Sequence, residues 1–190
     1  VTALAGMEYL SDWQNFQVEC TGERVFQDKV IHCYNNKVHG MVDMKSALAY
    51  SCNCYFAALA DEIGAGKLAK TMRQVGMDAD SRFELETSRN SIYLAKGATE
   101  SELVETAIGQ GRTGVTPLYM AMLASAFAND GMMMKPYIVD HVVYPDGTET
   151  KNTVPEKLTE ICTAEEAAAI KDMMIGVVSG GTGTAAAING

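Results

Sequence analysis

Apolar residues recur at helical spacing on both sides of a short polar break, Ser51-Cys52-Asn53. Residues three and four positions apart share one face of an α-helix, so such a stripe predicts a helix packed against a core. The stripes comprise Met44, Ala47 and Leu48 before the break, then Phe56, Leu59, Ala60 and Ile63, and finally Leu68, Met72 and Val75. A glycine follows each of the later two stripes, as is usual where a helix ends. We therefore expect three short helices within residues 41–75, with the polar break at their first junction.

Capping signals predict two further helices. Thr116 precedes Pro117, the order found where threonine caps a helix and proline takes its first position. Thr163 stands three residues before Glu166, which is the spacing of a capping box. Both signals come directly before apolar, helix-favouring runs, so we expect core helices to begin there.

The remaining segments carry weaker patterns. Residues 1–10 resemble the later turns of a helix, and residues 137–150 read as a β-hairpin that turns at Pro145-Asp146-Gly147. Residues 78–105 are polar and weakly periodic, which predicts a surface loop with short extended pieces. Because helices outnumber the one hairpin, the chain is expected to adopt an α+β, mostly helical fold.

Composition restricts the possible partners. The 190 residues contain 47% hydrophobic and 21% charged residues, which is ordinary for one globular domain or part of one. The formal charge of −9, without clustered lysine or arginine, argues against a nucleic acid or an anionic membrane as partner. The longest apolar helix candidate, residues 118–128, is too short to span a bilayer, and no signal peptide is visible. Any membrane anchor is therefore expected outside this sequence.

The five cysteines raise the question of metal or disulfide chemistry. Cys20, His32, Cys33 and His39 are residue types that bind zinc, but their spacing matches neither a CxxC nor an HxxxH pair. A disulfide between Cys20 and Cys33 would close a hairpin and suits an extracytoplasmic protein, and two free thiols are the alternative. The sequence thus predicts no metal ligand and no cofactor.

Two glycine-rich stretches resemble known sequence motifs. Residues 109–114 match GxGxxG, but the preceding residues are acidic and the next helix starts beyond the last glycine, which excludes a dinucleotide fingerprint. Gly181-Thr182-Gly183-Thr184 resembles a Lys-Thr-Gly-Thr element, but glycine replaces the lysine that supplies its charge. Neither stretch is assigned a catalytic role.

Several segments together resemble the transpeptidase domain of class B penicillin-binding proteins. They are Ser51-Cys52-Asn53-Cys54-Tyr55-Phe56, Ala107-Ile108-Gly109-Gln110-Gly111, Val115-Thr116-Pro117-Leu118, Ala128-Asn129-Asp130-Gly131 and Lys135-Pro136. Their order and spacing cover nearly the whole chain, so the resemblance is far more specific than any single motif.

The resemblance implies a fold in which residues 1–190 form one partial domain. This would be the helical part of the β-lactamase/transpeptidase-like fold, with an incomplete central sheet. The family's nucleophile lies in a Ser-x-x-Lys motif and its anion-binding strand carries Lys-Thr-Gly; neither occurs in this sequence. Both are expected outside residues 1–190, and the chain alone is expected to be inactive.

The resemblance also assigns the candidate site. Ser51 would relay a proton to the leaving nitrogen, and Asn53 would hydrogen-bond the lysine of the nucleophile and the substrate amide. The simpler interpretation of these two residues is a helix-capping pair. The implied partners of the full-length protein are peptidoglycan stem peptides and β-lactams, on the extracytoplasmic face of a bacterial membrane.

Two other functions remain open at this point. A β-lactamase or β-lactam sensor would share the fold, although the Ser-Cys-Asn and Gly-Gln-Gly stretches favour the transpeptidase. A non-catalytic helical scaffold would need none of this chemistry.

Overall fold

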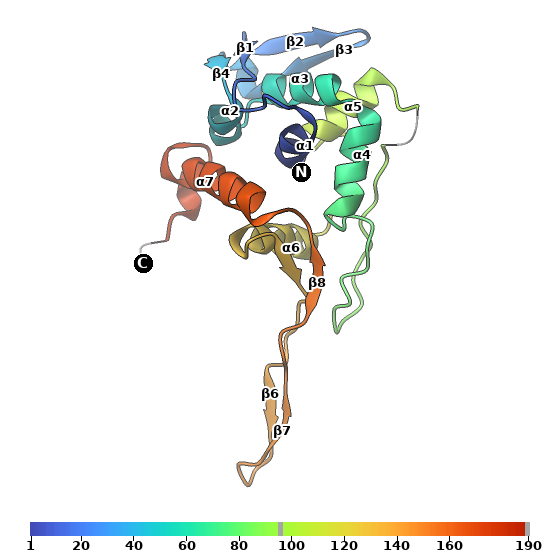
Figure 1. Ribbon diagram of the computed structural model, residues 1–190, viewed down its shortest axis with the longest axis vertical. Coiled ribbons are helices and arrows are strands. Elements are labelled where there is room, and N and C mark those ends of the chain that lie inside the picture. Colours follow the sequence, from blue (N-terminus) through green and yellow to red (C-terminus); the bar gives the residue numbers. More distant parts are fainter. Residues whose placement is uncertain (95–96, 189–190) are drawn as a thin grey trace.

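The computed structural model describes residues 1–94 and 97–188 (Figure 1). Its α-helices are α1 (Thr2–Tyr9), α2 (Met44–Tyr50), α3 (Asn53–Ile63), α4 (Ala65–Gln74), α5 (Glu100–Ala107), α6 (Pro117–Ala128) and α7 (Ala164–Gly180). Its strands are β1 (Val18–Cys20), β2 (Glu23–Phe26), β3 (Lys29–His32), β4 (Gly40–Val42), β5 (Met132–Met134), β6 (His141–Val143), β7 (Glu149–Asn152) and β8 (Lys157–Glu160). Short 3-10 turns occupy Tyr34–Asn36 and Thr184–Ala186.

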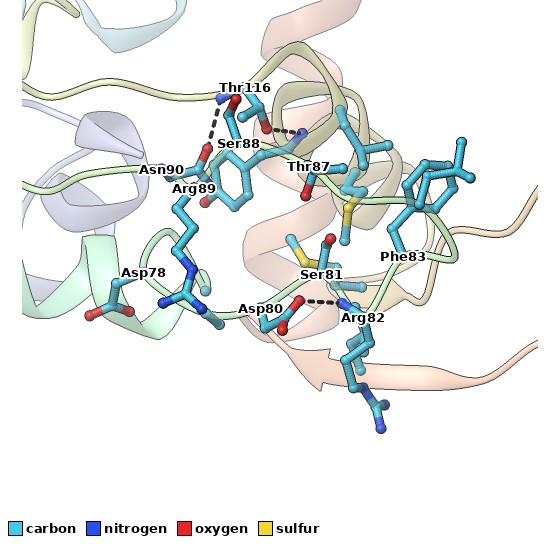
Figure 2. Close-up of a pocket in the computed structure, with 18 of the residues that line it drawn as sticks. Asp78, Asp80, Ser81, Arg82, Phe83, Thr87, Ser88, Arg89, Asn90 and Thr116 are labelled. Carbon is cyan, nitrogen blue, oxygen red and sulfur yellow. Dashed lines mark hydrogen bonds between the residues drawn. The ribbon is translucent and has the colours of Figure 1, made fainter.

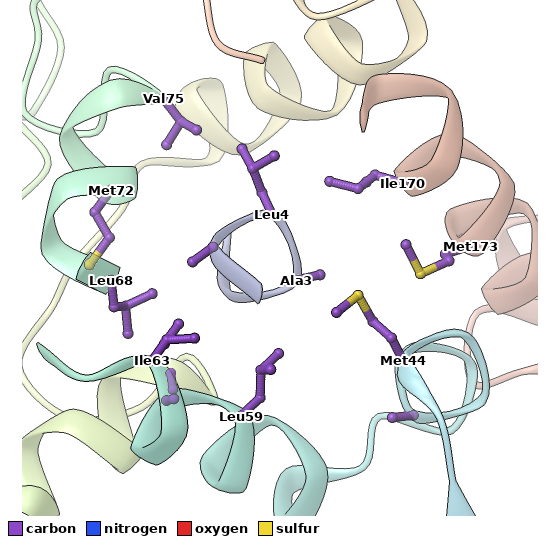
Figure 3. Close-up of a cluster of buried hydrophobic side chains, with 14 of the residues drawn as sticks. Ala3, Leu4, Met44, Leu59, Ile63, Leu68, Met72, Val75, Ile170 and Met173 are labelled. Atoms are coloured by element: carbon purple, nitrogen blue, oxygen red, sulfur yellow. The ribbon is translucent and has the colours of Figure 1, made fainter. Parts of the chain in front are cut away.

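Helix α1 lies at the centre of the hydrophobic core. Figure 3 shows Ala3 and Leu4 of α1 surrounded by apolar side chains from α2, α3, α4 and α7. The surrounding side chains are Met44, Leu59, Ile63, Leu68, Met72, Val75, Ile170 and Met173. Leu4 is fully buried, so the surrounding helices pack closely against this short segment.

The strands form small, separate antiparallel pairs. Within the described residues these are β1 with β4, β2 with β3, β5 with β8 and β6 with β7, each a two-stranded sheet. Beside β2 and β3, a second small cluster joins Phe26 and Ile31 to Ala57 of α3 and Val104 of α5. The described ranges hold no larger sheet, and the expected mostly helical α+β fold is confirmed.

Most expected helices are confirmed, with their caps. The Thr116 side chain accepts a hydrogen bond from the backbone N–H of Tyr119, and Pro117 takes the first position of α6. Thr163 and Glu166 form the reciprocal capping box that opens α7. Helix α2 begins with a similar box that the sequence analysis missed, in which the Asp43 side chain accepts from the backbone N–H of Ser46.

The prediction of a loop over residues 78–105 is wrong at its end. Helix α5 begins within that range, and a capping box of Thr99 and Glu102 opens it. Its buried face, Leu103, Val104 and Ala107, packs near α3. Only part of one short stripe falls inside the polar segment, which explains why periodicity failed to reveal this helix.

The expected hairpin within residues 137–150 is confirmed and projects from the body of the protein. Strands β6 and β7 pair antiparallel, with a register shift between Val142 and Val143, and form a narrow arm at the bottom of Figure 1. The exposed arm contributes little to the core. Among the described residues, no helix combines the length and apolar character that a membrane span needs.

Candidate active site

Ser51 and Asn53 lie at the junction of α2 and α3, as expected. Ser51 ends α2 with φ 55° and ψ 50°, a left-handed conformation that glycine or asparagine usually adopts at this position. Asn53 is the first residue of α3, and Cys52 between them is fully buried. Because the Cys52 side chain points into the core, the chain holds Ser51 at the exposed surface beside a half-buried Asn53.

The expected side-chain capping of α3 by these two residues is not formed, although Ser51 is the C-cap residue of α2. The N-cap of α3 is Cys52, and no side-chain cap hydrogen bond is formed there. Ser51 caps α2 through its backbone N–H, which points to the carbonyls of Ala47 and Leu48. Neither the Ser51 nor the Asn53 side chain forms a capping hydrogen bond. Helix capping therefore does not explain why serine and asparagine occupy these two positions.

Asn53 is oriented by one hydrogen bond. Its Nδ2 donates to the backbone carbonyl of His32 at the end of β3, at 2.8 Å. A carbonyl can only accept, so this contact fixes which end of the amide is the nitrogen. The Oδ1 atom and the second N–H of Asn53 therefore face other directions, where they can accept from a cation and donate to a carbonyl.

The end of α7 is docked against α2 just before Ser51. The backbone N–H of Thr182 donates to the carbonyl of Ala49 at 3.0 Å, and a Cβ placed on Gly181 would stand 2.3 Å from that same oxygen. This close approach requires glycine at residue 181. The Gly-Thr-Gly-Thr stretch thus has a packing role beside the candidate site.

Gln110 follows α5 in an exposed turn between two glycines of positive φ. Its backbone N–H donates to the Glu105 carbonyl at 2.9 Å. Just before this turn, the carbonyl of Ala107 accepts from the Thr2 hydroxyl at 2.8 Å. The Gly-Gln-Gly turn is therefore connected to the start of α1.

Four cysteines and a histidine gather directly behind the Ser51-Asn53 turn. The Sγ atoms of Cys20 and Cys33 are 3.6 Å apart, so the expected disulfide is not formed and the alternative of free thiols holds. Cys33 also lies 3.9 Å from Cys52 and 3.6 Å from Cys54, and the Nδ1 atom of His39 lies 3.4 Å from Cys20.

The fold thereby joins residues whose spacing along the chain argues against a common site. His32, which the sequence analysis grouped with them, instead faces Glu23, with its Nδ1 atom 3.4 Å from that carboxylate. The sequence analysis did not group Cys52 and Cys54 with these residues, because both lie in the stretch of residues 51–56 that it assigned to the break and the start of the next helix.

Burial and mutual contacts shift the thiol pKa values in this cluster. Burial raises the pKa of Cys33 to about 11. The pKa of Cys52 is lowered and that of Cys54 is raised, because the two side chains hydrogen-bond to each other.

A separate cavity lies away from this turn. The loop of residues 78–90 covers a hollow of about 960 Å³ against α6 and β8. Figure 2 shows side chains that line this hollow. Asn90 anchors the loop by accepting from the Thr116 N–H at 2.7 Å, and the Arg82 guanidinium pairs with Glu156 at 2.6 Å. None of the residues that line this hollow belongs to the Ser51-Asn53 turn or to the cysteine cluster, so we do not assign the candidate site to it.

Known proteins are similar to this chain in sequence and fold. The family model of the penicillin-binding protein transpeptidase domain matches residues 1–190. The peptidoglycan D,D-transpeptidase PbpA of Mycolicibacterium smegmatis is 33% identical over 141 residues, which are 70% of this chain and 27% of that protein. The chain spans about a quarter of the length of the curated relatives it matches.

Solved structures of transpeptidase domains are also similar to this chain. The D,D-transpeptidase domain of a peptidoglycan glycosyltransferase from Eggerthella lenta matches with a TM-score of 0.84 at 28% identity, over 100% of this chain and 49% of that one. Penicillin-binding protein A from M. tuberculosis, in its penicillin G acyl-enzyme complex, matches with a TM-score of 0.81 over 93% of this chain and 41% of that one. At 23% identity, this second likeness concerns the fold alone.

Proposed function

Because the chain belongs to the penicillin-binding protein transpeptidase family, we propose that it is part of a D,D-transpeptidase that cross-links peptidoglycan stem peptides by acyl transfer. The observation that carries this proposal is the Ser51-Cys52-Asn53 turn, whose two polar side chains are held at a helix junction without capping it. Since peptidoglycan lies outside the cytoplasmic membrane, the domain would work on the extracytoplasmic face, with any anchor outside residues 1–190.

The proposed reaction proceeds through a serine acyl-enzyme. A serine hydroxyl attacks the carbonyl of the D-Ala-D-Ala bond, the C–N bond breaks, and D-Ala leaves with a proton. An amine from a neighbouring strand then attacks the ester and releases the serine. A β-lactam would acylate the same serine by opening its ring amide.

The nucleophile is assigned to a segment outside these residues. No serine in the sequence is followed three positions later by lysine, and Ser51 is followed at that distance by Cys54. An ordinary hydroxyl needs a neighbouring base to become a nucleophile, so Ser51 is not given that role. We propose that residues 1–190 form the part of one transpeptidase domain that lies between its Ser-x-x-Lys and Lys-Thr-Gly motifs.

Ser51 fits the role of proton relay. It is exposed and lies at the left-handed residue that ends α2. A hydroxyl both donates and accepts, so it can pass a proton to the leaving nitrogen while it receives one from the catalytic lysine. Such a positioned proton transfer contributes roughly 10²–10⁴-fold to the rate.

Asn53 fits the role of a positioning group. Its hydrogen bond to the His32 carbonyl leaves Oδ1 to accept from the lysine ammonium and one N–H to donate to the substrate amide. One side chain would thus contact both the catalytic base and the peptide.

The test measures acylation by a fluorescent penicillin in the full-length protein that contains this chain. Asn53→Ala and Ser51→Ala should each slow acylation by at least about 100-fold. Matched controls are Asn129→Ala, which removes an amide contact to the Met132 carbonyl at 2.9 Å, and Ser125→Ala, which removes a hydroxyl contact to the Ala121 carbonyl at 2.8 Å. Both control variants should acylate at the parent rate.

Three results would contradict the proposal. Acylation rates that fall equally in the Asn53→Ala and Asn129→Ala variants would mean that the change acts only through stability. A stoichiometric penicillin adduct on Ser51 in residues 1–190 alone would identify Ser51 as the nucleophile. Rapid deacylation of the full-length protein would identify a β-lactamase.

A further inference from the structure

Helix α4 carries a stripe of positive charge on the outside of the helical body (Figure 1). Lys67, Lys70 and Arg73 are exposed and stand three positions apart, and the helix contains no acidic residue. Residues at this spacing lie on successive turns, so the stripe extends over about 9 Å. Because other residue types separate the three cations along the sequence, they become neighbours only in the helix.

The two lysines of the stripe have no carboxylate partner. Neither takes part in an ion pair among the described residues, and their ammonium groups lie 5.5 Å (Lys67) and 5.8 Å (Lys70) from the centroid of the Tyr9 ring. The carboxylate of Glu8, next to Tyr9, instead accepts hydrogen bonds from two polar side chains of α4 at 2.6 and 2.5 Å. An aromatic ring attracts an ammonium group but carries no net charge, so the two positive charges still repel each other.

Arg73 at the end of the stripe is only weakly paired. Its Nε atom lies 3.7 Å from the carboxylate of Asp78, and both side chains are about half exposed. Water and salt screen such a pair, so it contributes little. The guanidinium can therefore exchange this contact for the carboxylate of a partner.

The surroundings of the stripe limit the size of its partner. Exposed acidic residues stand at both ends of α4, Asp61 and Glu62 before it and Asp78 and Asp80 after it. A nucleic acid or an anionic membrane would have to cover these carboxylates as well, and a chain with a formal charge of −9 repels such a polyanion. A short acidic segment avoids them. Carboxylates three or four positions apart on a helix repeat on successive turns, which matches the spacing on α4.

We propose that Lys67, Lys70 and Arg73, together with the Tyr9 ring, form a docking surface for a short acidic helical segment of a partner protein. The three cations pair with carboxylates of that segment, and the half-buried Tyr9 ring packs against an apolar side chain between them. None of these residues belongs to the Ser51-Asn53 turn. The inference therefore stands without the proposed transpeptidase activity.

Binding of a defined peptide to the full-length protein that contains this chain tests the proposal. The probe is a fluorescent, alanine-based helical peptide of about 14 residues with glutamate at every third or fourth position. Saturable binding is expected by fluorescence anisotropy, and it should weaken as salt rises from about 50 to about 300 mM. Lys67→Glu and Lys70→Glu should each reduce the affinity by about 10-fold or more, because repulsion replaces attraction. Lys171→Glu is the matched control: it makes the same change of charge at an exposed position of α7 and should leave binding unchanged.

A second variant and a second peptide separate a specific surface from general attraction between charges. Lys67→Arg with Lys70→Arg keeps both charges and should retain binding. A peptide of the same composition with all its glutamates gathered at one end should bind at least about 10-fold more weakly. Equal affinity for the two peptides would overturn the proposal, as would an equal loss in Lys171→Glu or no binding at low salt. Tighter binding of inorganic polyphosphate at the same residues would assign the stripe to a phosphate polymer and overturn it too.

Discussion

The backbone N–H of Thr182 donates a 3.0 Å hydrogen bond to the carbonyl of Ala49, two residues before Ser51. The segment after α7 is thereby attached to the last turn of α2. An exposed ion pair between Lys45 and Asp172, at 2.6 Å, spans the same two helices. The position of the Ser51 turn thus depends on a part of the chain more than 100 residues away.

Gly181→Ala should destabilise the protein by about 1–3 kcal/mol, the usual cost of overpacking. The added Cβ would stand 2.3 Å from the Ala49 carbonyl oxygen, a backbone atom that cannot rotate away. Urea unfolding measures the loss. Gly176→Ala is the control, because open space surrounds that position within α7; there alanine should stabilise by up to about 1 kcal/mol. Equal effects of the two changes would contradict the close docking of α7 on α2.

Ser51→Gly should stabilise the fold while it slows acylation of the full-length protein. Glycine adopts the left-handed conformation of residue 51 without the cost that a side chain brings, so a gain of about 0.5–1 kcal/mol is expected. If Ser51 is the proposed proton relay, removal of its hydroxyl should reduce the acylation rate by about 10²-fold or more. Asp130→Gly, at another left-handed position, should give the stability gain without the loss of rate.

Asp43 should make the stability of the folded protein depend on pH in the acid range. Hydrogen bonds from the side chain and backbone of Ser46 lower the pKa of Asp43 below its usual value near 3.8. A lowered pKa in the folded state means that this contribution is present above about pH 4 and is lost as the pH falls through the folded-state pKa.

Asp43→Ala should therefore cost about 1 kcal/mol at pH 7 and progressively less in acid. Asp43→Asn should keep most of the cap and lose its pH dependence. Thermal unfolding from pH 7 to pH 3 measures both variants, and parallel profiles for all three proteins would refute the assignment.

Tyr119→Phe should cost about 1–3 kcal/mol, because it removes a buried hydrogen bond and leaves an acceptor without its donor. The Tyr119 hydroxyl donates to the Val75 carbonyl at 3.1 Å and links α6 to the end of α4. Tyr144→Phe, at an exposed position of the hairpin, should change stability by less than about 0.5 kcal/mol. The midpoints of denaturant unfolding measure the loss of stability in each of the two variants.

Local signals in the sequence were enough to predict the helices with strong caps. Thr116-Pro117 and the Thr163–Glu166 box each placed a helix start correctly. Helix α5 carries a similar box, but its stripe is short and the residues before it are polar, so pattern alone missed it. Strands of three or four residues are too short to show alternation, which explains why most of the small sheets were not predicted.

The junction that carries Ser51 and Asn53 could be predicted because it interrupts two stripes. The cysteine cluster could not, because its members approach one another only after β1, β4 and α3 have packed together. Cys20 and Cys52 are 32 positions apart, and no local spacing rule covers such a pair. Convergence over that distance is a property of the tertiary fold.

The β6–β7 arm should unfold separately from the rest of the molecule. Its two strands pair with each other, and β6 exposes all three of its side chains to solvent. Opening this arm breaks a few ladder hydrogen bonds and exposes almost no core, whereas opening α3 disrupts the centre of the protein. In hydrogen-exchange measurements, the amides of β6 should exchange orders of magnitude faster than those of α3. The chain should thus contain two levels of order, a helical body that holds the Ser51-Asn53 turn in one geometry and an arm that opens while the body remains native.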